Sequence, residues 1–144
     1  MKNYLDINVI HQYSRSYGRN LEYCEELYSE GKGYIALLIL FQTIENICKS
    51  IIENYDLRFI DVVTELRSKG FIDKQVEKFL SSGKHSIRRI RNLFSHADLS
   101  AISFFEEGIY YSLDEEESYL VLYEKLLIPS VDIMIILIKN KITN

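Results

Sequence analysis

The segment from Arg91 to His96, which reads RNLFSH, combines residue types that can act on a phosphodiester. Histidine titrates nearest to neutral pH and can accept or donate a proton, while arginine stays charged and matches phosphate oxygens with a planar fork. RNA carries its own nucleophile, the 2′-hydroxyl, so its cleavage needs a base, an acid and a cation, but no metal. The segment therefore predicts metal-independent RNA cleavage, with Arg91, Asn92 and His96 as the catalytic residues.

The segment lies in a basic part of an acidic chain. The formal net charge is −4, which argues against general coating of nucleic acid, because such binding is driven by many cations. No acidic residue occurs between Glu77 and Asp98, and this stretch, the basic segment, carries five cations: Lys78, Lys84, Arg88, Arg89 and Arg91. We expect Lys84, Arg88 and Arg89 to bind RNA. The alternative is a solvated helix face with a run of charges.

Apolar spacing places the basic segment within a helical fold. We expect a helix from Tyr4 to Glu30 that is interrupted near Gly18, and a central helix that is enclosed on every side over Tyr34 to Phe41 and continues its apolar face to Tyr55. A third helix ends at Gly70 with Ile60 inward, and a fourth contains the RNLFSH segment with Leu93 on its apolar face. The acids from Asp114 to Glu117 begin the next helix, and Pro129 begins or kinks the last one. Asp73 is expected to cap the helix after Gly70, and a short hairpin or a loop follows Asp98. The fold class is therefore all-α, an antiparallel bundle of four to five helices in a single domain, 1–144.

Composition also bears on the compartment. Cys24 and Cys48 lie in helical stretches without metal-ligand spacing, so we expect buried thiols in a reducing, cytoplasmic environment. The first residues lack the apolar centre of a signal peptide, and the run from Tyr34 to Phe41 is too short to span a bilayer. The three histidines form no ligand-spaced cluster, so neither a metal nor another cofactor is expected.

The spacing of Arg91, Asn92 and His96 resembles the signature of HEPN domains, an all-α superfamily that includes many metal-independent endoribonucleases of bacterial toxin–antitoxin and defence systems. The stretch from Gly33 to Glu45 is similar to the long second helix of such domains. The resemblance implies an RNA substrate, a homodimer with a composite site, an antitoxin protein as a partner, and supporting roles for Glu45 and Ser95. In one subgroup a tyrosine two residues after the histidine is the site of silencing; here that position is Asp98, which argues against that control.

Helix geometry gives a separate reason to expect a dimer. Five residues on an ideal helix separate two side chains by about 140° in azimuth and roughly 7.5 Å in rise. Arg91 and His96 therefore converge poorly within one helix, whose His96 side is expected to carry His85, Arg89 and Asn92 instead. A two-fold pairing would bring a second copy of the segment into the same cleft.

Purely structural roles remain open for His96 and Arg91. His96 can simply end a helix, where a cation suits the negative pole of the dipole. Arg91 can pair with Glu45, because a carboxylate between Ile44 and Ile47 needs a nearby cation if it is buried. Two functional alternatives follow: an inactive HEPN-fold module that binds RNA, a nucleotide or a protein, and an unrelated helical bundle that serves as an interaction domain.

Overall fold

The computed structural model describes residues 4–143 and is built almost entirely of helices. The elements are, in chain order, α1 (Tyr4–Tyr13), α2 (Arg15–Ser29), α3 (Gly33–Ile51), α4 (Phe59–Ser68), α5 (Lys74–Glu77), a π-helical turn (Lys78–Ser82), α6 (Ile87–His96), a 3-10 turn (Leu99–Ala101), β1 (Ser103–Glu106), β2 (Ile109–Ser112) and α7 (Glu116–Thr143). The all-α class is confirmed, and of the hairpin or loop predicted after the basic segment the structure has the hairpin. It has more α-helices than the four to five predicted, because α1 and α2 are separate helices and α5 is a short additional one.

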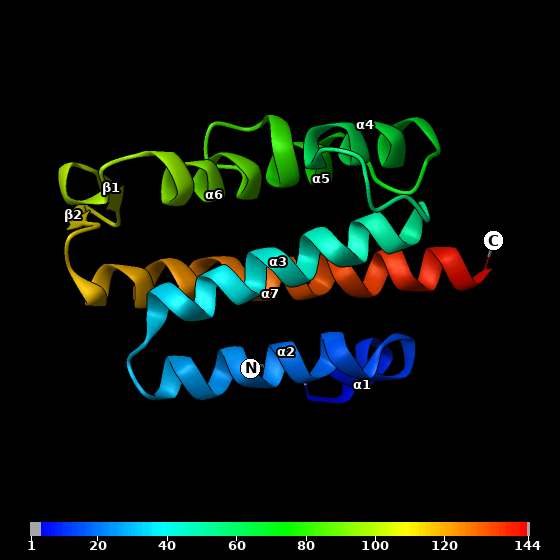
Figure 1. Cartoon of the computed structure of the whole chain (residues 1–144), viewed down its shortest axis with the longest axis horizontal. Helices are drawn as coiled ribbons and strands as arrows, with labels where there is room; N and C mark the ends of the chain where they lie inside the picture. Colours follow the sequence, from blue (N-terminus) through cyan, green and yellow to red (C-terminus); the bar gives the residue numbers. More distant parts are fainter. Residues whose placement is uncertain (1–3, 144) are drawn as a thin grey trace.

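The helices form three layers (Figure 1). α1 and α2 make one layer, α3 and α7 lie side by side in the middle, and the stretch from α4 to α6 covers the opposite face. α2 runs antiparallel to α3, and α3 runs antiparallel to the stretch from α4 to α6 (Figure 1). This stretch returns the chain to the end at which α3 begins, so α7 runs in the same direction as α3. The basic segment thus spans an outer layer supported by α3.

α3 forms the centre of the core, although less completely than the sequence indicates. Leu37, Leu40 and Ile44 are fully buried, which fits a helix packed between two layers. Ile35 and Leu38 are nevertheless 48% and 37% exposed, so the prediction of a helix enclosed on every side is wrong there. The two outer layers leave one strip of α3 uncovered, and the apolar residues on that strip face solvent.

The break in the N-terminal helical stretch falls at Ser14 and not at Gly18. Ser14 has an extended backbone, and its hydroxyl accepts a hydrogen bond from the Tyr17 amide, which caps α2. Gly18 lies inside α2, where a Cβ would come within 2.1 Å of the His11 ring. The glycine therefore serves close packing of α1 on α2, and the polar cap makes the turn.

Three other expectations need correction. Tyr55 was expected on the inward face of the central helix, but α3 ends at Ile51 and Tyr55 is 59% exposed. Ile60 and Leu93, also expected inward, are 38% and 39% exposed because each lies beside the buried face of a helix that the core covers on one side only. Pro129 does not begin a helix, because α7 runs through it from Glu116 to Thr143; it lies on the exposed side, where water can replace the hydrogen bond that proline removes.

Local signals were reliable elsewhere. Gly70 adopts φ +79° after α4, and Asp73 accepts the Val76 amide at 2.9 Å to cap α5. Both cysteines are buried and free, as predicted, and burial raises the pKa of the Cys24 thiol to about 12.

Gly33 lies at a close approach of the two middle helices, and we expect Gly33→Ala to destabilise the fold. A Cβ at this position would lie 2.6 Å from the Leu120 amide nitrogen and 2.7 Å from the Tyr119 carbonyl carbon. Because these are backbone atoms of α7, the helices must move apart, at about 1 to 3 kcal/mol of unfolding free energy. The measurement is urea unfolding by circular dichroism, with exposed Lys32→Ala as a control expected to change stability by less than about 0.5 kcal/mol. Equal stability of the two variants would contradict the close approach.

α3 is also the one helix among residues 4–143 whose length and composition would allow it to cross a membrane. More than half of the relevant stretch is buried inside the bundle. The core helix of a soluble protein meets the same two criteria, so this feature is weak evidence for a membrane span.

Candidate functional site

α6 carries the RNLFSH segment and is anchored at its N-terminus by a serine pair. The Ser86 hydroxyl accepts the Arg89 amide and donates to the Ser81 carbonyl at 2.8 Å. Arg88 reinforces this contact, because its Nε donates to the Ser81 hydroxyl at 3.0 Å and its terminal nitrogen donates to the Ser81 carbonyl. The π-helical turn and the start of α6 are thereby joined.

An aromatic cluster fixes the C-terminal half of α6. Phe94 is buried and stacks on Tyr34 with ring centroids 5.2 Å apart, while it contacts Phe41 and Tyr119 at 5.6 Å each. These rings come from α3 and α7, so α6 is held against both middle helices. The orientation of the helix about its own axis is consequently determined, and with it the direction of every other side chain in the segment.

Arg91 points toward α3, where it forms an ion pair with Glu45. Arg91 Nη1 lies 2.6 Å from Glu45 Oε2, and the Glu45 side chain is only 14% exposed. Lys49 approaches the other carboxylate oxygen at 3.7 Å from the next turn of α3. The contact considered from sequence between Arg91 and Glu45 is therefore present, and the largely buried carboxylate has two cations to stabilise it.

His96 and Asn92 lie on a different side of α6. His96 is the last residue of the helix and is exposed, and within residues 4–143 its imidazole makes no hydrogen bond or ion pair. Asn92, one turn earlier, is partly exposed. With Arg91 held on α3 and about 140° separating positions 91 and 96, the arginine and histidine do not converge within one chain.

The remaining predicted site residues differ in whether their side chains are exposed or engaged with other parts of the protein. Lys84 and Arg89 are exposed, whereas Arg88 is engaged with Ser81. Ser95 Oγ donates to the Arg91 carbonyl at 3.3 Å, an intrahelical contact that does not reach His96. His85 lies in the turn before Ser86, outside α6, so the expected stripe on the His96 side begins only at Arg89.

Two positioning residues escaped the sequence analysis. Lys49 follows Glu45 by four residues on a predicted helix, and this spacing alone is a signal for an ion pair. Ser81 gave no such signal, because its contact with Arg88 depends on the path of the π-helical turn. Asp98, noted as a departure from the HEPN pattern, accepts the Ser100 amide and caps the 3-10 turn.

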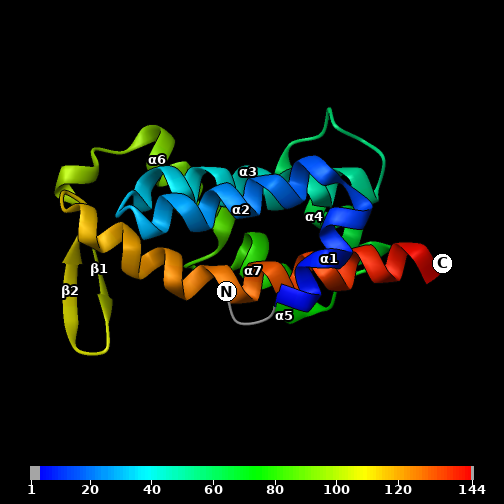
Figure 2. The ribbon, with the colours of Figure 1, turned by 90° about the horizontal axis from the view of Figure 1, so that it is seen from below.

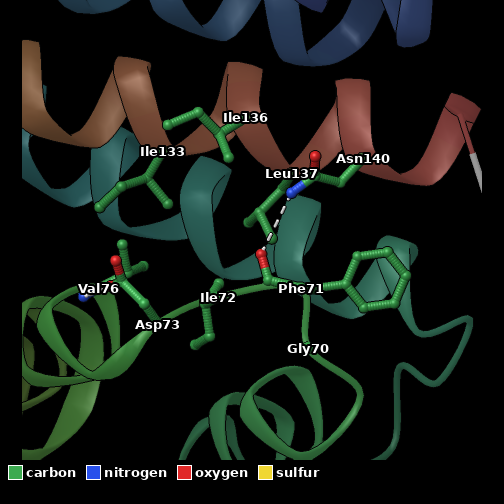
Figure 3. Close-up of a pocket in the computed structure, with 9 residues that line it drawn as sticks. All are labelled: Gly70, Phe71, Ile72, Asp73, Val76, Ile133, Ile136, Leu137 and Asn140. Atoms are coloured by element: carbon green, nitrogen blue, oxygen red, sulfur yellow. Dashed lines mark hydrogen bonds between the residues drawn. The ribbon is translucent and has the colours of Figure 1, made fainter.

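An apolar hollow at the opposite end of the bundle offers no catalytic chemistry. It lies between the turn from Gly70 to Asp73 and α7, and Figure 3 shows its walls formed mainly by aliphatic side chains such as Ile133 and Ile136. The Asn140 amide bridges it by donating to the Phe71 carbonyl at 3.4 Å. Across residues 4–143, no group of three or more histidine, cysteine, aspartate or glutamate side chains is placed to hold a metal ion. α6 therefore remains the candidate site.

No protein-family model matches this chain, and neither the curated proteins nor the solved structures compared with it include a match.

Proposed function

We propose that the chain is a metal-independent endoribonuclease of HEPN type, from a toxin or defence system of the cytoplasm, which cleaves RNA by transesterification from the 2′-hydroxyl. The observation that carries the proposal is the state of the segment on α6: His96 is exposed and unpaired within the described residues, while Arg91 is held in place by Glu45. A free imidazole can exchange protons with RNA. An arginine oriented by a carboxylate is preorganised for a phosphate that approaches from solvent.

The direct test is incubation of the purified protein with single-stranded RNA in the presence of a chelator. Transesterification predicts fragments that end in a 2′,3′-cyclic phosphate, because the 2′-oxygen displaces the 5′-oxygen of the next nucleotide. Intact RNA under these conditions, or fragments with a 3′-hydroxyl, would refute this mechanism.

We expect the active species to be a two-fold dimer that pairs two copies of α6. The expectation rests on the separation of Arg91 from His96 within one chain and on the exposed Leu93 beside Asn92, an apolar side chain that a second helix would cover. Light scattering should give twice the 17.0 kDa chain mass at micromolar concentration, and Leu93→Glu should shift the protein to monomer and reduce cleavage. A parent protein that is monomeric and cleaves fully would exclude the composite site.

RNA affinity should depend on salt with a modest slope. Lys78, Lys84 and Arg89 are exposed cations of the basic segment, whereas Arg88 and Arg91 have protein partners. About three neutralised phosphates on a single strand give a slope of log affinity against log salt of about −2. Fluorescence anisotropy with labelled oligouridine at several salt concentrations measures this slope. Affinity that is independent of salt would contradict phosphate contacts by these cations.

The second candidate is a HEPN-fold module that binds RNA or a protein without cleaving. The observation that favours it is the same ion pair, because Glu45 neutralises the Arg91 charge that the reaction requires. RNA that binds with the expected salt slope but remains intact would support this candidate over the nuclease.

A further inference from the structure

The chain changes from a basic to an acidic stretch at the end of α6. The basic segment before Asp98 has no acidic residue, whereas residues 97–124 contain no lysine, arginine or histidine. This second stretch carries eight acidic residues: Asp98, Glu106, Glu107, Asp114, Glu115, Glu116, Glu117 and Glu124. Several have internal partners, such as Glu106 with Lys125, but Glu107, Asp114 and Glu115 are exposed. The hairpin of β1 and β2 lies entirely within this acidic stretch.

The hairpin exposes an aromatic pair that the fold does not use. Phe105 and Tyr110 face each other across the two strands with ring centroids 4.9 Å apart, and they are 57% and 76% exposed. The opposite face carries Phe104 and Tyr111, which are partly buried and stack at 5.2 Å. Figure 2 shows the hairpin projecting away from the helices. Exposed aromatic patches of this kind mark interaction surfaces.

The strand register directs the backbone N–H and C=O groups of Phe105 and Tyr110 away from the ladder between β1 and β2. The Leu113 amide donates to the Ile102 carbonyl at 2.8 Å, and hydrogen-bonded pairs alternate with non-bonded pairs in an antiparallel ladder. Phe105 and Tyr110 therefore form a non-bonded pair, whose N–H and C=O groups point outward from the two strands. An extended segment can add to such an edge through main-chain hydrogen bonds, with its side chains reaching the aromatic face.

We propose that this hairpin docks an extended segment of a partner protein that alternates basic and apolar residues. The apolar residues would cover Phe105 and Tyr110, and the basic residues would meet the exposed carboxylates nearby. RNA fits this surface poorly, because the acidic stretch repels phosphates. A second copy of this chain also fits poorly, since its hairpin is equally acidic and its cations at Arg88, Arg89 and Arg91 belong to a folded helix. The proposal is independent of RNA cleavage.

The test uses the full chain and a fluorescein-labelled peptide of alternating lysine and valine as the probe. We expect binding in fluorescence anisotropy, and a loss of about tenfold or more in affinity for the double variant Phe105→Ser with Tyr110→Ser. The matched control replaces Tyr23 and Tyr55, which are 51% and 59% exposed elsewhere, with serine and should bind like the parent. Circular dichroism establishes that both variants keep the helical fold.

Two further peptides distinguish docking on the aromatic pair from electrostatic attraction alone. A peptide of alternating glutamate and valine should not bind, and one of alternating lysine and serine should bind clearly less tightly than the lysine and valine probe. The proposal is overturned if the parent does not bind the probe, if the control variant loses as much affinity as the hairpin variant, or if lysine and serine suffice. It is equally overturned if the hairpin variant loses oligouridine affinity, which would make the hairpin an RNA-stacking platform, or loses self-association, which would make a second copy the occupant.

Discussion

His96→Ala should lower single-turnover RNA cleavage by about 10²- to 10⁴-fold, which is the usual contribution of a positioned general acid or base. RNA affinity and helicity should stay near those of the parent. The reason is structural: the imidazole is exposed at the end of α6 and makes no hydrogen bond or ion pair within residues 4–143. A neutral imidazole also contributes little to phosphate binding. Rapid mixing of excess enzyme with labelled RNA, alongside anisotropy and circular dichroism, measures the three quantities.

The matched control is His85→Ala. His85 is also exposed and lies in the turn immediately before α6, so its loss should leave cleavage within about twofold of the parent. If His96→Ala cleaves RNA like the parent, the nuclease proposal is wrong. If His96→Ala loses helicity instead, the histidine serves to end α6, as the structural alternative holds.

Arg91→Ala should impair three properties at once. Cleavage should fall by about 10²- to 10³-fold, because the phosphorane loses its cation, and RNA affinity should also fall. Stability should decrease by about 1 to 2 kcal/mol, because Glu45 is largely buried and would keep only Lys49. The estimate is modest because the Arg91 side chain is itself 34% exposed and solvent screens part of the pair. Arg91→Lys should remain poor in cleavage, since a point charge cannot reproduce the planar fork.

The double variant with Glu45→Gln separates catalysis from structure. In Arg91→Ala with Glu45→Gln, the buried carboxylate that Arg91→Ala leaves with Lys49 alone is removed, so stability should return toward that of the parent. Cleavage should stay low, because the cation is still absent. Recovery of cleavage together with stability would show that Arg91 acts only as the partner of Glu45, and the catalytic assignment would fail.

Features that depend on neighbouring residues were predictable from sequence. Gly70 and Asp73 end one helix and cap the next through contacts within a few residues. The hairpin follows from the turn at Glu107 and Gly108, which have φ values of 49° and 81°, between two short apolar strands. The ion pair of Arg91 with Glu45 joins distant residues, and the sequence offered it only as one open alternative, because a buried carboxylate requires a nearby cation.

Features that depend on packing between distant segments were predicted poorly. Gly18 indicated a helix break by its type alone, yet it lies inside α2, where a Cβ would meet the packed His11 ring, and the cap at Ser14 makes the turn. Ile35 and Leu38 are apolar but exposed, because coverage of α3 depends on where α2 and α6 lie. Ser81 positions Arg88 through a π-helical turn that has no periodic signal.

The sequence by itself determined the all-α class, the helical setting of the basic segment and the chemistry available to Arg91, Asn92 and His96, because these follow from periodicity and from the properties of single side chains. Only the tertiary structure decided that Arg91 turns inward to α3 while His96 remains in solvent. The rotation of α6 about its axis decides this, and Phe94 sets that rotation by packing against Tyr34, Phe41 and Tyr119. Those rings are far from Phe94 in the chain, and no local pattern specifies how they meet.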